Sequence, residues 1–374
     1  MLRFVSHLFI ITVLLLFTGC NNKVMSENEQ PGEQLGITHV GTPAQSFSEF
    51  ENILERIRTD LKIPGFSAAI SKNGKIVWAK GFGFADKENG KVATPETVYH
   101  LASLTKPFAA TLIMQLVEEK KINLEDPIIN YGVDLGNKNI KIKHLLSHTS
   151  ENTPGTSYNY NGNRYSSLDI IVKAVTNKSF CELLNERIIM PLGLNSTGPY
   201  PLSQNNCLKH DSQNQQISRK LAQGYTPNGQ HRMAYPKYFG TAAGLVSNVI
   251  DLCKFSIALD DNILISDKSK KIMFTPTISN NGEELPYGLG WFIDNNDGLK
   301  IVWHYGKWDA ISSLIVKIPE RGISFVILAN SDRLSSASGG IGFTEDVNCS
   351  VVAQEFLNAF VFGKVQLPDL QVLK

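Results

Sequence analysis

The chain has 374 residues, of which 42% are hydrophobic and 19% are charged, and its formal net charge at pH 7 is +1. A chain of this length and composition can bury a large hydrophobic core. With so small a net charge, the composition gives no indication of a nucleic acid or another polyanion as partner.

The first segment along the chain has the form of an export signal. A short basic start at residues 1–3 precedes an apolar run from Leu8 to Phe17, which is too short to span a bilayer. The sequence Leu16-Phe17-Thr18-Gly19-Cys20 resembles a bacterial lipobox, which implies a signal peptide over 1–19 and a lipid on Cys20. A simple secretory signal or an uncleaved anchor is the alternative. Each of them predicts a location in the cell envelope, periplasmic or extracytoplasmic, with a membrane anchor in the lipoprotein case.

Residues 20–45 are polar and rich in Asn, Glu, Gln and Gly, which is typical of a flexible tether, so we expect the folded domain over 46–374. Apolar residues recur at helical spacing across 46–61, which predicts an amphipathic helix. Two predicted strands, Gly65 to Ser71 and Lys75 to Phe82, then flank Asn73-Gly74, a pair that favours a tight hairpin turn.

Ser103-Leu104-Thr105-Lys106 is an S-x-x-K tetrad at the start of an apolar helix. Residues i and i+3 share a helix face, so the Lys106 amine can reach back over Ser103 Oγ. A serine hydroxyl becomes a good nucleophile when a base removes its proton, and a lysine can be that base once burial lowers its pKa. Pro107 is tolerated only in a first helical turn, so the helix must begin close to Ser103. Such a tetrad occurs by chance about once in a chain of this length, so other motifs must decide its meaning.

The middle of the chain is predicted to be helical, with periodic stretches at 168–175 and 181–189 and a polar surface excursion at 203–220. His144 and His148 stand four residues apart, as two zinc ligands on one helix face can. No acidic residue of the H-E-x-x-H type lies between them, so we interpret them as helix-end structure and expect no metal.

The last third of the chain is predicted to return to the sheet, with strands near 301–305, 312–318 and 323–329 and a helix from about Asp346 to Phe362. Sheet strands therefore come from both ends of the chain. We expect a sheet subdomain made of about 46–100 and 245–374, with a helical subdomain of about 101–244 inserted between its two parts.

Three motifs occur in a defined order: S-x-x-K at Ser103, a Tyr-x-Asn-like element at Tyr160, and His304-Tyr305-Gly306 before the late strands. In this order they resemble the serine β-lactamase and penicillin-binding-protein superfamily, in the branch of class C β-lactamases, related D-Ala-D-Ala carboxypeptidases and carboxylesterases. The resemblance spans about residues 46–362. It is supported by four connecting segments, at 144–150, 222–225, 243–247 and 287–291.

The resemblance implies an α/β (α+β) fold with an antiparallel sheet, flanking N- and C-terminal helices and an inserted helical region. It also implies catalysis through an acyl-enzyme without a cofactor. Ser103 would be the nucleophile and Lys106 the first choice of base, with Tyr160 passing the proton to the leaving group. Whether Lys106 or Tyr160 is the formal base stays open, because nearby cations, including a protonated His304, would lower the pKa of a phenol.

The oxyanion is expected to bind the backbone N–H groups of Ser103 and Lys307, and Gly306 would let a substrate acyl group lie against the strand. Asn161 and Asn163 are candidates for substrate binding. They flank Gly162, which occupies the third position of the second motif, where the family usually has Asn. Glu151 likewise follows 148–150 where the family usually has Gly, and Tyr305 and Trp308 are candidates for the cleft wall.

We therefore expect an exported, lipid-anchored serine hydrolase that acts on an amide, β-lactam or ester bond. The alternatives are a D-Ala-D-Ala or D-amino-acid peptidase acting on peptidoglycan, and a non-catalytic envelope binding protein on the same scaffold. The expected partners are a small-molecule or peptide substrate and a membrane, through Cys20. The other cysteines allow three disulfide pairings or free thiols: Cys181, Cys207, Cys253 and Cys349.

Overall fold

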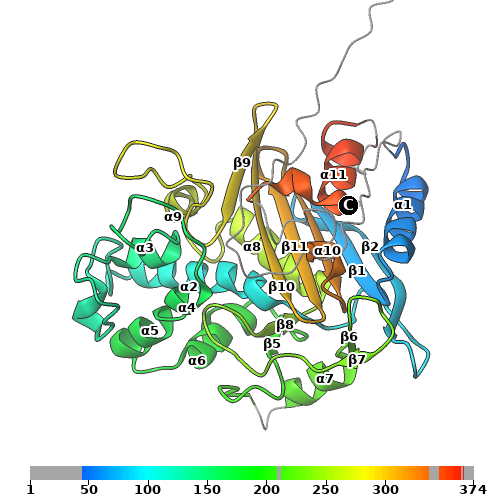
Figure 1. Cartoon of the computed structure of the whole chain (residues 1–374), viewed down its shortest axis with the longest axis horizontal. Helices are drawn as coiled ribbons and strands as arrows, with labels where there is room; N and C mark the ends of the chain where they lie inside the picture. Colours follow the sequence, from blue (N-terminus) through cyan, green and yellow to red (C-terminus); the bar gives the residue numbers. More distant parts are fainter. Residues whose placement is uncertain (1–43, 209–211, 337–344, 364, 366–374) are drawn as a thin grey trace, which may run out of the picture.

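A computed structural model describes residues 44–208, 212–336, 345–363 and 365, so the expected lipobox, Cys20 and most of the tether lie outside the described residues. An antiparallel sheet forms one half of the molecule and a group of helices forms the other (Figure 1). Within the described ranges, no helix combines the length and the apolar character that crossing a membrane requires.

The main sheet has the strand order β3-β2-β1-β12-β11-β10-β9, and every neighbouring pair is antiparallel. Its strands are β1 (Gly65–Lys72), β2 (Lys75–Asp86), β3 (Lys91–Val92), β9 (Phe292–Asn296), β10 (Leu299–Trp308), β11 (Ile311–Ile318) and β12 (Ile323–Ala329). The two ends of the chain meet where β1 pairs with β12, from Phe66 opposite Ala329 to Lys72 opposite Ile323. The strands expected from both chain ends are therefore confirmed as parts of one sheet.

The predicted hairpin turn joins β1 to β2. Asn73 and Gly74 both have positive φ angles, 48° and 77°. A two-residue turn with this left-handed backbone matches the twist of the flanking strands, and Asn and Gly are the residues that adopt it at least cost.

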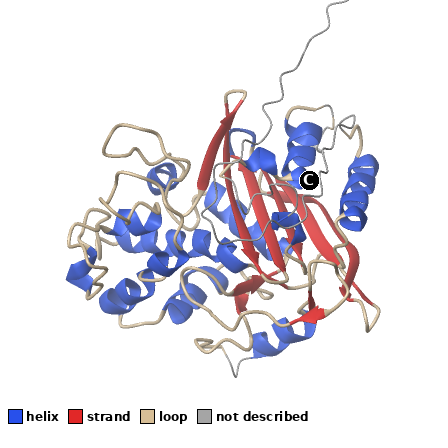
Figure 2. Cartoon of the chain, viewed as in Figure 1, coloured by secondary structure: helices blue, strands red, loops and turns tan. Residues whose placement is uncertain are grey.

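Helices from the two chain ends cover one face of the sheet (Figures 1 and 2). They are α1 (Phe47–Asp60), η5 (Val347–Cys349), α11 (Val351–Phe356) and its continuation η6 (Leu357–Val361). Aromatic rings fill the space between them, since Phe50 lies 4.9 Å from Phe360 and Phe325 lies 4.9 Å from Phe356, measured between ring centroids. Ser46 caps α1 by accepting a hydrogen bond from the backbone N–H of Glu49.

On the opposite face, α8 (Val249–Asp260) packs against β1 and β12 and carries the core into the helical half. There the rings of Phe108 and Phe255 stack 3.8 Å apart. The helices of this half are η1 (Ala102–Thr105), α2 (Lys106–Glu118), η2 (Ile128–Tyr131), α3 (Ile142–Leu146), α4 (Gly162–Tyr165), α5 (Leu168–Thr176), α6 (Phe180–Leu184), η3 (Asn185–Ile189) and α9 (Asp267–Met273). The helices predicted at 168–175 and 181–189 are thus confirmed.

The polar segment 203–220 was predicted as a surface excursion, and its second half is the helix α7 (Ser212–Lys220), most of whose residues are exposed. Ile217 on α7 is buried in a small apolar cluster with Val98 and Tyr235. A disulfide between Cys181 and Cys207, with a Cα–Cα distance of 5.9 Å, ties the start of this segment to α6, whereas Cys253 on α8 is a buried free thiol.

Short strands connect the two halves: β4 (Tyr99–His100), β5 (Gly198–Pro199), β6 (Gly224–Tyr225), β7 (Arg232–Met233) and β8 (Leu245–Ser247). Two short helices lie at the main sheet, α10 (Arg333–Ser336) and η4 (Pro319–Arg321).

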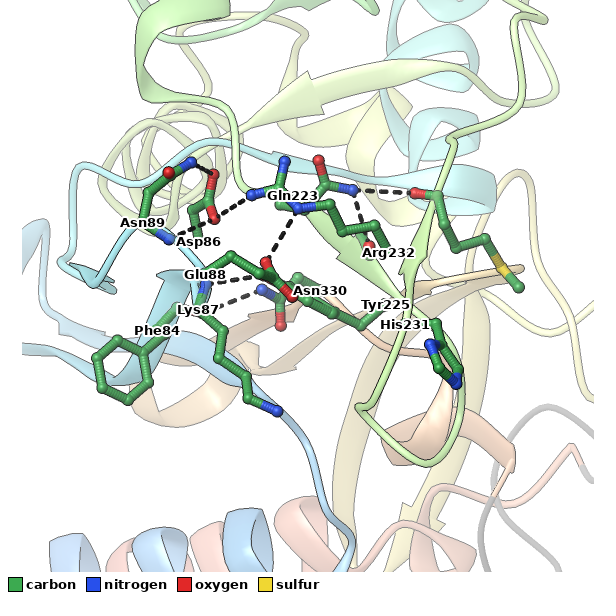
Figure 3. Close-up of polar contacts among 12 residues, drawn as sticks. Phe84, Asp86, Lys87, Glu88, Asn89, Gln223, Tyr225, His231, Arg232 and Asn330 are labelled. Atoms are coloured by element: carbon green, nitrogen blue, oxygen red, sulfur yellow. Dashed lines mark hydrogen bonds and ion pairs between the residues drawn. The ribbon is translucent and has the colours of Figure 1, made fainter.

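Figure 3 shows the contacts that hold the β6–β7 hairpin. Arg232 forms ion pairs with Asp86 at 2.8 Å and Glu88 at 3.0 Å, and the Tyr225 hydroxyl donates to Glu88 at 2.6 Å. Asn330 donates to the backbone of β2 beside this cluster. The returning chain is therefore fixed to the end of β2.

Candidate active site

Ser103 and Lys106 face each other across one turn of 3-10 helix. Lys106 Nζ lies 3.0 Å from Ser103 Oγ, and the backbone N–H of Lys106 donates to the carbonyl of Ser103. Ala102, directly before the serine, has a φ of 46° and so adopts the left-handed conformation that non-glycine residues avoid. The Nδ1 atom of His100 accepts a hydrogen bond from the Ala102 N–H, which supports this conformation. Ser103 is half-buried and reachable, while Lys106 is only 1% exposed.

Lys106 is buried without a counter-ion. Its Nζ donates to the carbonyl of Ala242 at 3.0 Å and lies over the rings of Tyr160 and Tyr165, 4.7 and 5.4 Å from their centroids. No carboxylate among the described residues lies within ion-pair distance. Burial lowers the pKa of Lys106 to about 7. A neutral amine, able to accept a proton from Ser103 Oγ, is therefore well populated at neutral pH.

Tyr160 is a protonated phenol, whereas a phenolate base must be deprotonated. Its hydroxyl oxygen is buried and has no hydrogen-bond partner in the described part of the molecule. Burial raises the pKa of Tyr160 well above its ordinary value, Tyr305 adds to this shift, and the nearby Ser103 hydroxyl opposes it. The phenol therefore stays protonated, which favours Lys106 as the base.

His304 lies on β10, fully buried, with its ring centroid 6.5 Å from that of Tyr160. Its Nδ1 is 2.6 Å from the carbonyl oxygen of Tyr305, and its Nε2 is 2.8 Å from the Tyr287 hydroxyl. A carbonyl can only accept, so Nδ1 carries the hydrogen and Nε2 accepts from Tyr287. Burial holds the pKa of His304 well below its usual value, and Lys106 lowers it further. His304 is therefore neutral and does not supply the positive charge considered from the sequence.

Gly306 is required by a close approach between backbones. A Cβ atom at this position would lie 2.0 Å from the carbonyl oxygen of Leu101 and 2.4 Å from Ser313 Oγ. We expected the glycine to admit a substrate, but the nearest neighbour is the segment that leads into Ser103. The approach places β10, with the half-buried Lys307, beside η1. The two backbone N–H groups expected at the oxyanion thus belong to adjacent segments.

The second motif departs from the expected substrate contact. The Asn161 side chain caps α4 by accepting from the Arg164 N–H at 2.9 Å, and its amide donates to Glu151 at 2.5 Å. Both polar groups of Asn161 are therefore occupied by the protein, and Asn163 is exposed. At Gly162 a Cβ would meet only Lys106 Nζ, at 4.0 Å, which leaves open space beside the lysine.

Two residues of the site were missed by the sequence reasoning. His148 lies just after the end of α3 with a φ of 54°, as the helix-end interpretation requires, and its ring also packs in a tilted arrangement against Tyr160 with centroids 4.2 Å apart. Its Nδ1 accepts from the Asn161 N–H at 3.1 Å, so it holds the segment that carries the tyrosine. Tyr287 orients His304. Both residues lie in connecting segments that support the family resemblance, at 144–150 and 287–291. Membership in these segments was the sequence feature that could have identified them as site residues.

Of the two residues expected at the cleft wall, Tyr305 lies beside Tyr160 and Trp308 lies farther along the chain among other aromatic side chains. The ring of Tyr305 lies 6.4 Å from that of Tyr160 in a stacked arrangement, whereas Trp308 packs near His100 and Tyr238. Within the part of the chain that the structure describes, no group of three or more His, Cys, Asp or Glu side chains is arranged to hold a metal ion.

Comparisons with known proteins show which proteins this chain is similar to. A family model described as Beta-lactamase matches residues 50–340. Protein flp from Staphylococcus aureus (strain MW2) is 28% identical over 330 residues, covering 76% of this chain and 63% of that protein. Penicillin-binding protein 4* from Bacillus subtilis (strain 168) is 24% identical over 316 residues, covering 70% and 67%. The chain thus spans slightly less than two thirds of the length of the flp proteins.

Solved structures have the same fold. The octameric penicillin-binding protein homologue from Pyrococcus abyssi superposes with a TM-score of 0.68 at 27% identity, covering 76% of this chain and 74% of that one. The D-stereospecific amidohydrolase from Streptomyces sp. has a TM-score of 0.64 at 20% identity, covering 86% and 99%. The sheet with its inserted helical region is therefore a shared architecture.

Proposed function

The chain belongs to the Beta-lactamase family, and from this premise we propose that it is a serine hydrolase that forms an acyl-enzyme on Ser103. One observation carries the proposal: Lys106 is buried, has no counter-ion among the described residues and has a pKa of about 7, and its Nζ lies 3.0 Å from the Ser103 hydroxyl. An amine in this state can take the serine proton at neutral pH.

The proposed reaction proceeds in two acyl transfers. Neutral Lys106 accepts the proton of Ser103 Oγ while the oxygen bonds to the substrate carbonyl carbon, and the carbonyl becomes an oxyanion. The backbone N–H groups of Ser103 and Lys307 donate to this oxyanion. The proton then passes through the Tyr160 hydroxyl to the leaving group as its bond to carbon breaks. Water then attacks the acyl carbon while Lys106 accepts one of its protons, and Lys106 returns that proton to Ser103 Oγ as the bond between Oγ and the acyl carbon breaks.

We propose an amide, β-lactam or ester as the bond that is cleaved. A D-amino-acid peptidase is the closest alternative, supported by the fold shared with a D-stereospecific amidohydrolase. A non-catalytic binding protein is supported by Gly162 in the second motif and by the commitment of the Asn161 amide to Glu151.

The nucleophile is tested by labelling with a fluorescent penicillin and a fluorophosphonate, followed by intact mass measurement. We expect one adduct in the native chain and none in Ser103→Ala, with Ser157→Ala as a control because Ser157 is exposed in the segment leading to Tyr160. Labelling of Ser103→Ala at the native rate would refute the assignment. Turnover of nitrocefin, an acyl-D-Ala-D-Ala peptide and p-nitrophenyl esters then separates lactamase, peptidase and esterase, and a chain that reacts with none of these probes is a binding protein.

We also propose export and a lipid anchor on Cys20, on the evidence of the sequence alone. The test is fractionation of cells that express the chain with Cys20 or with Cys20→Ala. We expect the native chain in the membrane fraction and the variant released from it. Equal membrane association of the two chains would count against the lipid.

A further inference from the structure

A pocket in the helical half is lined by residues of α3 and of the segment that follows α9. Figure 1 shows where these two helices lie. The volume of the pocket is about 470 Å³, within the range of small-molecule sites. Ser147 and Thr149 line it, while His148 between them turns its ring to Tyr160. The pocket and the active site therefore lie on opposite sides of one segment, and none of Ser103, Lys106, Tyr160 and His304 lines the pocket.

The wall of this pocket is mainly apolar, formed by Leu124, Ile272, Pro276, Ile278 and Leu289. Two of these side chains are unusually exposed for isoleucine, with Ile278 57% and Ile272 41% accessible. An exposed apolar patch at the edge of a hollow favours an apolar ligand, because binding would remove that surface from water.

Positive charge prevails around the apolar wall. Lys143 and Lys271 line the pocket together with one carboxylate, Glu125. Glu125 is shared between Lys143 at 2.6 Å and Lys141 at 2.7 Å, and Lys271 pairs with Asp267 at 2.7 Å. Three lysines thus face two carboxylates, and an anionic group is favoured at this end of the pocket.

His144 contributes a hydrogen-bond donor without a partner. The residue lines the pocket and is only 7% exposed, and its Nδ1 accepts from the Lys141 N–H at 3.1 Å. Burial lowers the pKa of His144 to about 4, and Lys143 and Lys141 add to the shift, so the ring is neutral with its hydrogen on Nε2. Nε2 has no hydrogen-bond partner among the described residues. This N–H is available to an acceptor bound in the pocket, because His144 lines the pocket.

We propose that this pocket binds a small amphipathic carboxylate, with an unbranched acyl chain against the apolar wall and its head group at Lys143, Lys271 and the His144 N–H. The volume fits one small molecule, and the lysines and the unpartnered donor select an anionic acceptor over a cation. The site is distinct from the Ser103 site, and it does not depend on the proposed hydrolase activity.

The test is calorimetric titration of the full chain with decanoate. Decyltrimethylammonium has the same chain with the opposite charge, and acetate has the head group without the chain. We expect one decanoate per chain and affinities at least about tenfold weaker for both controls. Equal affinity for the cation would overturn the proposal, as would the absence of decanoate binding.

Variants locate the binding. Ile278→Glu should weaken decanoate at least about tenfold by placing a carboxylate in the apolar wall, whereas Ile263→Glu changes an isoleucine that is 64% exposed but outside the pocket. Unchanged decanoate binding in Ile278→Glu would refute this site. It would also be the result if decanoate bound at Ser103 as a reaction product. His144→Asn retains an acceptor for the Lys141 N–H and loses the Nε2 donor. It should weaken decanoate severalfold with an unchanged unfolding midpoint, and native affinity would refute the role of the donor.

Discussion

Two buried lysines of this molecule have opposite surroundings. Lys317 in the sheet is as inaccessible as Lys106, but its Nζ forms an ion pair with Asp260 at 2.9 Å and donates to Ser324 at 3.2 Å and to Ser256. Lys106 has a backbone carbonyl, a serine hydroxyl and two aromatic rings. Burial lowers the pKa of both amines, and at Lys317 the charge of Asp260 opposes the shift.

The difference teaches what turns a buried lysine into a base. Removal from water disfavours the ammonium form in both regions, but a carboxylate at hydrogen-bond distance restores much of its stability. Lys317 is thus held as one half of an ion pair between α8 and the sheet. Lys106 has no such partner, so its proton is easily lost beside Ser103. Four experiments test this comparison.

The largest effect is expected from Lys106→Met. Removing the base should slow acylation by roughly a thousandfold or more, while the fold is retained, because an apolar side chain replaces a buried amine that has no counter-ion. Stopped-flow acylation by a reactive ester or β-lactam measures the rate, and circular dichroism verifies the fold. Near-native acylation by the folded variant would transfer the role of base to another group.

The same substitution at Lys317 should have the reverse consequence. Lys317→Met leaves Asp260 without its partner, and breaking a buried ion pair costs roughly 3 kcal/mol of stability. Urea unfolding measures this loss, and the acylation rate of the folded protein should stay close to native. If acylation by folded Lys317→Met fell as far as in Lys106→Met, the contrast between the two lysines would be wrong.

The pH dependence of acylation separates Lys106 from Tyr160 as the base. Below its pKa of about 7 Lys106 is protonated and cannot accept a proton, so kcat/KM should fall tenfold for each unit of pH below about 7 and level off above it. A phenol whose pKa is raised by burial would instead give a rate that keeps rising above pH 10. The profile is measured with an uncharged ester, whose own charge does not change with pH.

The smallest effect is expected from Asp260→Asn, which makes Lys317 resemble Lys106. Without the carboxylate the folded-state pKa of Lys317 falls further below that of the unfolded chain. Between the folded and the unfolded pKa the unfolded chain binds more protons, so stability is reduced at neutral pH and recovers as the pH rises toward the unfolded pKa of about 10. We expect a loss of about 1 kcal/mol at pH 7, from urea unfolding at pH 7 and 9.5. A loss that is equal at both values would show that Lys317 keeps its charge.

Local sequence predicted much of this molecule. Asn73-Gly74 specifies a turn that only a few residue types adopt easily, and the strands on either side of it follow from their apolar patterns. Ser103 and Lys106 were paired because one helical turn separates them, and the observed 3.0 Å contact agrees. The order of three motifs indicated which distant segments belong together, and the Beta-lactamase family match supports that assignment.

Other features required contacts between residues far apart in the chain. Gly306 could be recognised as special, but its reason, the Leu101 carbonyl 2.0 Å from a hypothetical Cβ, depends on β10 meeting η1. His148 was interpreted as helix-end structure and does lie at the end of α3, but only the fold brings its ring against Tyr160. The neutral state of His304 follows from Tyr287 and the Tyr305 carbonyl.

The sequence alone determined most of the elements, the turn and the pairing of Ser103 with the Lys106 amine, because these depend on residues within one turn or one strand of each other. Only the tertiary structure decided the protonation states. The free energy of a buried charge depends on how much water is removed and on which opposite charges lie nearby, and both are set by segments that meet only in the folded chain. The two lysines are the same amino acid, and the fold gives one of them an ion-pair partner and lowers the pKa of the other to about 7.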